Sequence, residues 1–554
     1  MMENKDLEAE IRPLKKEDRK LQGTLGTPAG KEDPLKGTPQ LSHLSRCRTV
    51  VFFLSLFICL FTVFVVSFIV PCPERSASQG TWRINFSQAV TYDFLGIQDV
   101  NRDRIQDILI LYKSTNSSNA SSGFCLEEGF ASPCTFVAAL SGANGSILWE
   151  RPAAQDKALV DCADPPPEPH AAAPACFLLG RSSSLMAVDS ATGGTLWSHP
   201  SLPGRARNAS ILSALLRVPD IDADGSPDLL VLTQEGTEVK GYMYSGSTGQ
   251  QIGQPGSLSV DRMSGGPLHV TRADAHYVLF PCGGSLCGSS MKALSEEVIG
   301  RESPLRRDPE WEAILNASAH SLQLRSAGAI RYLVKVPETA GQDLLLVGSE
   351  ACVLLDGQKL APRWIFHASQ VLRKPVFGHY KPDAWAVVIE NGTSTDRQIL
   401  LLDLSSGAVL WSHLLPRSPG DLHSASLLTA DHRSAFFFWG LHRPVGTNET
   451  EPVEAQHGLY MFHPMLPNVL LQLTNVSAPI IAFRAVLLEP GRHAACVVLT
   501  GPTSPEASGL VSVTKYGVRA LVSASRVVRL AQGEQDSEEA IKDRFSRLRY
   551  WRES

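Results

Sequence analysis

Four aspartates at short and regular spacing are the residues of this sequence best suited to hold a metal ion. They lie in the segment Asp220-Ile-Asp222-Ala-Asp224-Gly225-Ser-Pro-Asp228, directly before the apolar run Leu-Leu-Val-Leu. Alternate carboxylates present several oxygens to one hard cation, and a glycine at the sixth place lets the loop curl. Without a cation, four clustered carboxylates would repel one another. The spacing therefore predicts a calcium site with all four aspartates as ligands.

A second segment repeats this pattern less completely. It reads Asp99-Val-Asn101-Arg-Asp103-Arg104-Ile-Gln-Asp107 and also precedes an apolar run. Arg104 stands where the first segment has glycine, so the turn is costlier and a positive charge lies near the cation. We expect weak or absent calcium binding by the three aspartates and the asparagine of this segment. The simpler interpretation of both segments is a set of Asx turns without a cation.

Other patterns that carry chemistry are missing from the sequence. It contains no Gly-x-Ser-x-Gly nucleophile elbow, no His-Glu-x-x-His and no Gly-x-x-x-x-Gly-Lys phosphate loop. Five histidines between residues 423 and 463 follow no metal-ligand spacing. We therefore predict no catalytic residues and a protein that is not an enzyme. An enzyme whose residues come singly from distant strands stays the alternative, because a motif search does not detect it.

The elements that must position these loops are predicted to be short buried strands. Eight apolar runs recur along the chain, and successive runs start 42 to 69 residues apart. Uninterrupted apolar runs of this length are typical of strands buried on both faces. The runs begin at Asp107, Cys176, Asp228, Tyr277, Asp343, Trp385, Phe436 and Cys496.

Glycine-bearing turns, often followed by tryptophan, recur between these runs. Examples are Ser141-Gly-Ala-Asn-Gly-Ser-Ile-Leu-Trp149, Asp189-Ser-Ala-Thr-Gly-Gly-Thr-Leu-Trp197 and Asp403-Leu-Ser-Ser-Gly-Ala-Val-Leu-Trp411. Glycine supplies positive φ at a hairpin tip, and a tryptophan is large enough to pack between neighbouring sheets. The repeat predicts an all-β protein, a β-propeller of seven or eight blades. Two stacked β-sandwiches are the alternative, although they do not require the same hairpin to recur.

These motifs resemble known propeller families. The Asp-x-Asp-x-Asp-Gly-x-x-Asp-Leu-Leu-Val run is similar to the FG-GAP repeats of integrin alpha propellers, and the Thr-Gly-x-x-Leu-Trp hairpin is similar to those of quinoprotein-type propellers. Over nearly its whole length the chain resembles the family with sequence similarity two hundred thirty-four. The resemblance implies structural calcium in the loops and a single-pass type II membrane glycoprotein.

A membrane span is predicted over residues 49–70, which contain neither a charge nor a proline. A cleaved signal peptide is the competing interpretation, but 48 mostly polar residues precede the span. Arg46 and Arg48 lie just before the span, so the positive-inside rule places the N-terminus in the cytoplasm. Residues 1–48 lack the apolar content of a folded core and are expected to form a disordered tail. The predicted topology is single-pass type II.

Composition excludes several protein classes. The 554 residues are 43% hydrophobic and 19% charged, with a net charge of −5. The sequence does not concentrate Lys and Arg in the kind of basic stripe that binds a phosphate backbone, so we expect no nucleic-acid partner. The charge divides into +2 before the span and −7 after it.

The part after the span carries the marks of the secretory pathway. Nine of the 12 asparagines lie in Asn-x-Ser/Thr acceptor sites, all of them after residue 70. We predict glycosylation at Asn85, Asn116, Asn119, Asn144, Asn208, Asn316, Asn391, Asn448 and Asn475.

Nine of the 11 cysteines also follow the span. Three pairs are close enough in sequence to form local disulfides: Cys125 with Cys134, Cys162 with Cys176, and Cys282 with Cys287. Cys352 and Cys496 lie in apolar runs and are expected to be buried thiols. The odd cysteine at the membrane exit, Cys72, predicts a disulfide-linked dimer as one option.

The expected domain order is a cytoplasmic tail (1–48), a signal-anchor helix (49–70), a juxtamembrane linker (71–90), a propeller (91–530) and a C-terminal amphipathic helix (531–554). In the last segment Ile541, Phe545, Leu548 and Trp551 share one helical face. We expect this face to pack on the propeller.

The function that these features favour is a membrane-anchored propeller that binds an unidentified protein partner, in adhesion or as a receptor. The partner would bind at its rim or top face, with calcium stiffening loops at the opposite end. An ecto-enzyme with a central-channel site is one alternative. A secretory-pathway accessory subunit is another and differs mainly in location, at an internal membrane rather than the cell surface.

Overall fold

The structure is a computed structural model of the whole chain. It describes residues 41–69, 79–114, 119–162, 175–181, 184–202, 210–212, 215–258, 266–282, 285–317, 321–323, 328–337, 342–368, 370–392, 396–416, 423–442, 456–489, 494–531 and 536–551. The chain forms two compact units, Met1–Arg75 and Ser76–Ser554.

The described residues of the first unit form a long helix, α1 (Leu41–Ile69). Its window Arg48–Val65 has a mean hydropathy of 2.4, and none of it is buried. The 29 residues of α1 correspond to about 43 Å at helical rise, enough to cross the hydrocarbon core. The predicted span is thus confirmed as a candidate membrane helix. The helix begins eight residues before the span, and Val70 lies outside the described residues.

The second unit consists of antiparallel sheets, which we number as blades in chain order. Blade 1 contains the second half of β1 (Thr81–Gln98), β2 (Asp107–Ser114), β3 (Thr135–Leu140) and β4 (Ile147–Ala154); blade 2 contains β5 (Ala158–Cys162), β6 (Ala175–Gly180), β7 (Leu185–Asp189) and β8 (Thr195–His199); blade 3 contains β9 (Ser210–Ile211), β10 (Leu216–Val218), β11 (Asp228–Glu235), β12 (Glu238–Tyr244) and β13 (Gln251–Leu258); blade 4 contains β14 (Leu268–Val270), β15 (His276–Cys282), β16 (Ser285–Ser290) and β17 (Ser321–Gln323).

The remaining blades follow the same order. Blade 5 contains β18 (Ile330–Lys335), β19 (Leu344–Gly348), β20 (Ala351–Leu355) and β21 (Pro362–His367); blade 6 contains β22 (Val376–Lys381), β23 (Ala384–Gly392), β24 (Asp396–Asp403) and β25 (Val409–Pro416); blade 7 contains β26 (Ala425–Leu428), β27 (Ser434–His442), β28 (Gln456–Phe462) and β29 (Val469–Val476), with β33 (Arg526–Arg529) on its edge; blade 8 contains β30 (Ile480–Leu487), β31 (Ala494–Thr500), β32 (Gly509–Gly517) and the first half of β1.

The long strand β1 closes the ring. Its first half pairs with β32, from Thr81 opposite Tyr516 to Ala89 opposite Gly509. Its second half pairs with β2, down to Gln98 opposite Asp107. One strand therefore serves as the outermost strand of blade 8 and the innermost strand of blade 1. The expected linker 71–90 was too long, because the propeller begins at Thr81.

The packing confirms a propeller of eight blades in the described part of the chain. Eight hydrophobic clusters each join two consecutive blades, and the last of them joins blade 8 to blade 1. The predicted apolar runs all lie in the second strand of a blade; in blade 3, β9 and β10 both pair with β11 and together count as the first strand. In β2, for example, Ile108 and Ile110 face blade 8, whereas Leu109 and Leu111 face blade 2. Burial on both faces explains why these runs are uninterrupted.

Tryptophans fasten five of the junctions between blades. In each case the indole Nε1–H donates to a backbone carbonyl of the following blade. The five pairs are Trp82 with Gly142, Trp149 with Ser190, Trp197 with Gly246, Trp364 with Leu404 and Trp411 with Pro467. Four of these rings also lie against a positive-φ glycine of the turn that they reach. The predicted packing of tryptophan between sheets is thus confirmed.

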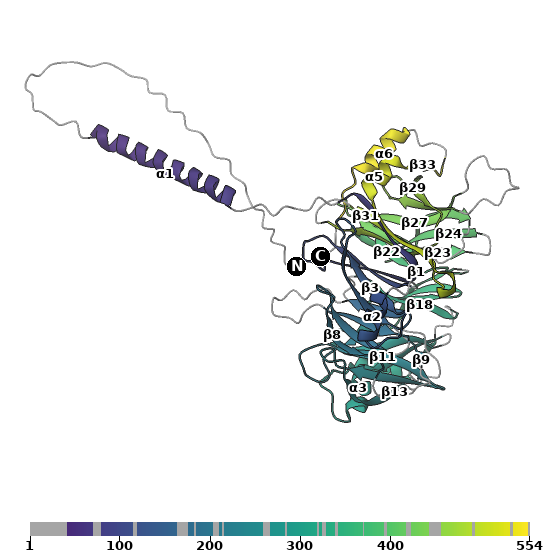
Figure 1. Cartoon of the computed structure of the whole chain (residues 1–554). Coiled ribbons are helices and arrows are strands. Elements are labelled where there is room, and N and C mark those ends of the chain that lie inside the picture. Colours follow the sequence, from purple (N-terminus) through teal and green to yellow (C-terminus); the bar gives the residue numbers. More distant parts are fainter. Residues whose placement is uncertain are drawn as a thin grey trace, which may run out of the picture. The chain divides into compact units, whose positions relative to one another are not determined.

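Helices occupy the other three junctions. In blade 4, α3 (Met291–Ile299) packs at the junction with blade 3, and α4 (Pro309–Ala317) packs at the junction with blade 5. At the junction of blades 7 and 8 lie α5 (Val518–Ala524) and α6 (Glu538–Ser546), which Figure 1 shows beside β29 and β31. Two smaller helices, α2 (Asn119–Glu127) and the 3-10 helix at Pro505–Ala507, lie in connections.

The C-terminal segment differs from the amphipathic helix expected over residues 531–554. Ile541 and Phe545 are buried as expected, and Leu548 packs on the same core. However, α6 ends at Ser546, and the chain then turns at Arg547 and continues without regular structure to a bridge between Tyr550 and Thr429. Tyr550 is therefore buried, whereas Trp551 is 62% exposed.

Candidate functional site

Both aspartate segments lie at the same end of the propeller. Each connects the first and second strands of a blade, in blades 1 and 3. In a four-stranded antiparallel blade, the turn between the third and fourth strands emerges at that end too. We call this end the loop face. It carries the aspartate segments and the glycine turns on which the tryptophans pack.

Three of the four predicted calcium ligands come together in blade 3. Oxygen atoms of Asp220, Asp222 and Asp224 all lie within 4.8 Å of one another. The carboxylate of Asp220 accepts the N–H groups of Ala223 at 2.6 Å and Gly225 at 2.9 Å. Asp222 in turn accepts the N–H of Asp224 at 3.0 Å. The loop's own backbone thus holds the three carboxylates, which we call the aspartate trio.

The electrostatics of the trio fit a hard cation. Desolvation, together with the charges of Asp224 and Asp220, raises the pKa of Asp222. A hydrogen bond from the Ser247 hydroxyl lowers the pKa of Asp224. Three convergent carboxylates form the all-oxygen donor set that Ca²⁺ takes in proteins, with backbone carbonyls and water completing its shell. The residues present therefore fit calcium.

The fourth predicted ligand, Asp228, has other partners. It is fully buried at the start of β11. One of its oxygens accepts the N–H of Ile221 at 2.6 Å, and the other accepts that of Gly246 at 3.3 Å. Burial raises its pKa to about 6. Asp228 therefore ties the aspartate loop to the turn between β12 and β13.

The segment in blade 1 uses Asp107 in the same way. This carboxylate accepts the N–H of Val100 and that of Gly142, each at 3.0 Å, and burial raises its pKa to about 6. Asn101 and Asp103 bind each other at 2.9 Å, and Asp99 accepts the N–H of Arg104. Within the described residues, the acidic group able to hold a metal is the trio in blade 3.

A third aspartate shows that this tie is a recurring device. Asp343, directly before β19 in blade 5, accepts the N–H of Gly357 at 3.0 Å and pairs with Arg363 at 2.9 Å. The aspartate that precedes an apolar run in blades 1, 3 and 5 thus binds the turn between the third and fourth strands. The sequence contained the signal, an Asp before the run, but it did not reveal the partner.

The three predicted local disulfides are present, joining Cys125 to Cys134, Cys162 to Cys176, and Cys282 to Cys287. Cys352 and Cys496 are buried thiols, as expected, and burial raises the pKa of the Cys352 thiol to about 12. Cys72, on which the dimer prediction rests, lies outside the described residues.

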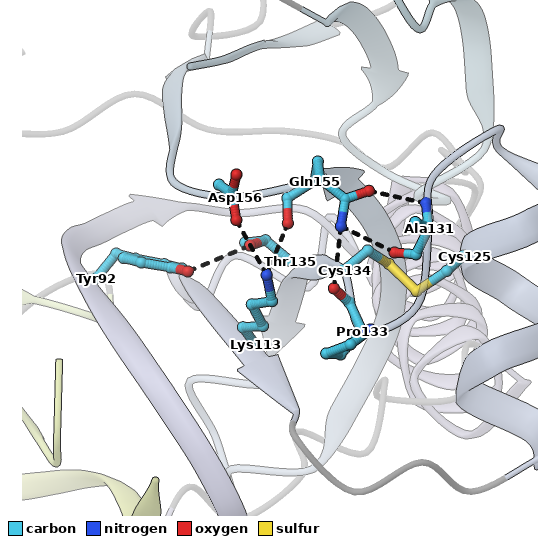
Figure 2. The surroundings of a disulfide bond; sticks show 9 residues. All are labelled: Tyr92, Lys113, Cys125, Ala131, Pro133, Cys134, Thr135, Gln155 and Asp156. Atoms are coloured by element: carbon cyan, nitrogen blue, oxygen red, sulfur yellow. Dashed lines mark hydrogen bonds and ion pairs between the residues drawn. A yellow bond between two sulfur atoms is a disulfide. The ribbon is translucent and has the colours of Figure 1, made fainter. Parts of the chain in front are cut away.

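Polar contacts hold the first disulfide against blade 1. Figure 2 shows Gln155 beside the bond, donating to Ala131 and Pro133 and accepting the N–H of Ala131. Lys113 binds the Gln155 carbonyl at 2.9 Å and Asp156 at 3.1 Å. The insertion between β2 and β3 is therefore fixed to the connection between β4 and β5, which Lys113 ties in turn to β2.

Four predicted glycosylation sites have described side chains. Asn85, Asn144 and Asn475 are exposed, whereas Asn391 is half-buried and its Oδ1 accepts the N–H of Gln370. Asn119 and Asn316 lie in helices without described side chains, and Asn116, Asn208 and Asn448 lie outside the described residues.

The histidines between residues 423 and 463 form no metal-capable group in the described part of the chain. His423 contacts Asp93 at 3.1 Å, His432 contacts Asp383 at 3.1 Å, and His463 is buried against Thr429.

Known proteins resemble this chain over most of its length. Human Protein FAM234A is 63% identical over 554 residues, and the alignment includes the full length of both chains. Chicken Protein FAM234B is 29% identical, with 91% of this chain and 83% of the relative aligned. Among solved structures, the WD40 domain of SCAP from fission yeast matches 78% of this chain and 98% of its own, at 8% identity and a TM-score of 0.41.

The match to a family model covers the complete ring. The model is described as the FAM234A/B beta-propeller and matches residues 82–551, from the second residue of β1 to the segment after α6. Both the identity to relatives over the full length and the eight-bladed ring now support one assignment: the chain belongs to the FAM234A/B β-propeller family.

Proposed function

We propose that this protein is a membrane-anchored, calcium-supported propeller that binds a protein partner and is not an enzyme. The observation that carries the proposal is the aspartate trio, whose carboxylate oxygens converge within 4.8 Å. Such a cluster is stable when a cation offsets the mutual repulsion. Calcium is the cation that suits its all-oxygen donors.

Contacts around the trio explain how calcium would stiffen the ring. Asp224 accepts hydrogen bonds from the hydroxyls of Ser245, at 3.0 Å, and Ser247. Both serines belong to the turn between β12 and β13. The same turn receives the indole of Trp197 from blade 2, which binds the carbonyl of Gly246 at 3.2 Å. Order in the trio therefore extends to the junction of blades 2 and 3.

A rigid ring with such supports suits recognition of a protein surface. The candidate membrane helix precedes the ring and would anchor it. Arg46 and Arg48 before the span favour a cytoplasmic N-terminus, and with that orientation the propeller would lie in the lumen of the secretory pathway or at the cell surface. Calcium at millimolar concentration is available there to a weak extracellular-type site.

The calcium proposal is tested by removing charge without removing hydrogen-bond acceptors. In the Asp222→Asn/Asp224→Asn double variant, the rise in Tm that 1 mM calcium gives the wild-type protein should disappear. The Tm in excess chelator should change little, since asparagine keeps the acceptor oxygens. The matched control, Asp99→Asn/Asp103→Asn in blade 1, should keep the calcium response. An equal response in wild type and the blade 3 variant would refute the calcium site.

The partner proposal is tested in cells by proximity labelling from the C-terminal end of the chain. We expect labelled proteins that are enriched over a control anchored by the same helix but carrying an unrelated domain. Surface biotinylation of intact cells then separates a cell-surface receptor from an accessory subunit of internal membranes. Labelling no different from the control would contradict partner binding.

A further inference from the structure

The outer edge of blade 6 differs from the other outer edges of the ring. Its fourth strand, β25, pairs with β24 on one side, and no described strand pairs with its other side. The pairing shifts at Leu410 and then continues regularly through six residue pairs, from Trp411 to Pro416. β25 carries no charged residue, and its one proline is the last residue. A long uncharged edge presents unpaired N–H and C=O groups that can pair with another extended chain.

Two other outer edges are covered by the chain itself. In blade 7, β33 pairs with β29 through four residue pairs. In blade 3, α3 packs against β13, and the Glu297 carboxylate of α3 accepts the N–H of Ser257 at 3.0 Å. An added strand and a covering helix are thus both used in this protein to close an edge.

The remaining outer strands are short or carry charge. β8 has five residues, and β17 has three. The longer strands contain charged residues or proline: Glu150, Arg151 and Pro152 in β4, Pro362 and Arg363 in β21, and Arg83 in the first half of β1. These features discourage pairing between edges. β25 lacks them along its regular part, so nothing in its own sequence opposes a partner strand.

We propose that β25 pairs antiparallel with β25 of a second copy of this chain. The two four-stranded blades would then form one continuous sheet about a two-fold axis. Pairing of two identical edges closes both of them at once, whereas a foreign strand would leave its own second edge open. The dimer depends neither on calcium in blade 3 nor on the protein partner proposed above.

The side chains of β25 suit pairing with the same strand of another copy. The regular residues that can donate an N–H group, Trp411–Leu415, are centred on His413. A two-fold axis there places Ser412 of each copy opposite Leu414 of the other, so that Leu414, 63% exposed in the single chain, becomes covered. Desolvation lowers the pKa of His413, so the two imidazoles that meet on the axis are uncharged at neutral pH. No like charges therefore face one another across the axis.

The candidate membrane helix favours a second copy over a soluble strand. α1 would hold every copy in the same membrane, which raises the effective concentration of one β25 for another. A single pair of strands buries less surface than a standard stable interface, so this enrichment in one membrane supports the dimer.

The first test identifies the molecule that lies against β25 in intact cells. Two full-length copies with different tags are co-expressed, each with Cys72→Ser so that no disulfide through Cys72 joins them. One copy carries Leu414→benzoylphenylalanine, and illumination should yield an adduct that contains both tags. The matched control is Leu196→benzoylphenylalanine on β8 of blade 2, where the leucine is 49% exposed; it should give no such adduct. No adduct at Leu414, equal adducts at both positions, or an adduct with a different protein only would overturn the proposal.

An exchange of charges decides whether two β25 strands face each other. Ser412→Asp/Leu414→Asp places like charges opposite one another in the dimer, and so does Ser412→Lys/Leu414→Lys. Either variant alone should co-precipitate its differently tagged copy about tenfold less than wild type does. A mixture of the aspartate and lysine variants should regain the association, because opposite charges then meet, and such recovery also shows that both variants are folded. Unchanged association of either variant alone, or no recovery in the mixture, would refute the pairing.

Discussion

Gly193 shows how a single residue governs a junction between blades. Its φ is +68°, and an added Cβ would lie 2.6 Å from an atom of the Trp149 ring. In Gly193→Ala, the ring must move away from the turn of blade 2 and weaken its hydrogen bond to Ser190. We expect a loss of about 3 kcal/mol in the free energy of unfolding, of which about 1 kcal/mol comes from the positive φ. Denaturant unfolding of the purified protein measures it.

The control for this prediction is Gly236→Ala. Gly236 has a similar φ of +65°, but nothing lies within 4 Å of an added Cβ. This variant isolates the backbone strain and should lose only about 1 kcal/mol. Equal losses in the two variants would mean that contact between tryptophan and glycine contributes nothing to the junction.

The same residues show what the sequence could reveal. The hairpins with a glycine and a following tryptophan were predicted, and so was packing of the tryptophan between sheets. The partner was not, because Trp149 contacts Gly193 of the next hairpin rather than Gly145 of its own. Similarly, the spacing of Asp220, Asp222 and Asp224 predicted that their carboxylates converge. The same spacing also predicted Asp228 as a ligand, because the sequence does not reveal that its carboxylate accepts the N–H of Gly246.

At the scale of elements, the junction of blades 4 and 5 uses a histidine where others use tryptophan. His269, in β14, donates from Nε2 to the carbonyl of Gly357 in blade 5 at 2.8 Å and stacks on Trp311 of α4. Its Nδ1 is buried without a hydrogen-bond partner in the described structure. A proton on Nδ1 would therefore be a buried charge without compensation. Burial, with Lys335 nearby, lowers the pKa of His269 to about 4.

This shift predicts a loss of stability in acid. Because the pKa in the folded state lies below the unfolded value of 6.5, the stabilisation is complete above pH 6.5 and is lost as the pH falls towards 4. The shift corresponds to about 3 kcal/mol. In His269→Gln, an amide replaces the imidazole, so the fall in stability between pH 6.5 and pH 4 should be smaller by this amount. Unfolding curves at several pH values measure it, and parallel pH dependence in both proteins would contradict the prediction.

The C-terminal elements show a limit of periodicity. A helical pattern correctly placed Ile541 and Phe545 in the core, but it also placed Trp551 there. The helix ends at Ser546 because the chain can pair with the edge of blade 7, where Tyr550 bridges Thr429. That pairing joins residues 121 positions apart, and no local pattern reports it.

At the scale of the whole molecule, ring closure sets the boundary of the domain. The first half of β1 has no partner close in sequence, since it pairs with β32 more than 400 residues later. Before that pairing is known, residues 81–90 look like part of a linker. The eight apolar runs, by contrast, are local, and each was correctly read as a strand. Sequence thus predicted the repeated unit of the fold better than its closure.

The orientation of the whole molecule gives the last prediction. Asn85, Asn144 and Asn475 are exposed in the folded ring, so each can carry a glycan without disturbing the core. If the propeller is luminal, digestion with peptide-N-glycosidase in heavy-oxygen water should convert these asparagines to labelled aspartates. Protease added to sealed microsomes should then remove only the residues before α1.

A cytosolic propeller would give the opposite pair of results, with no labelled aspartate and digestion of the ring. A charge variant tests the cause of the orientation. Arg46→Glu/Arg48→Glu reverses the charge next to the span, so part of the protein should insert with the ring outside the lumen and without glycans. Lys31→Glu/Lys36→Glu changes the same number of charges farther from the span and should have a smaller effect. If both variants remain fully glycosylated, the two arginines do not determine which side of the membrane the propeller occupies.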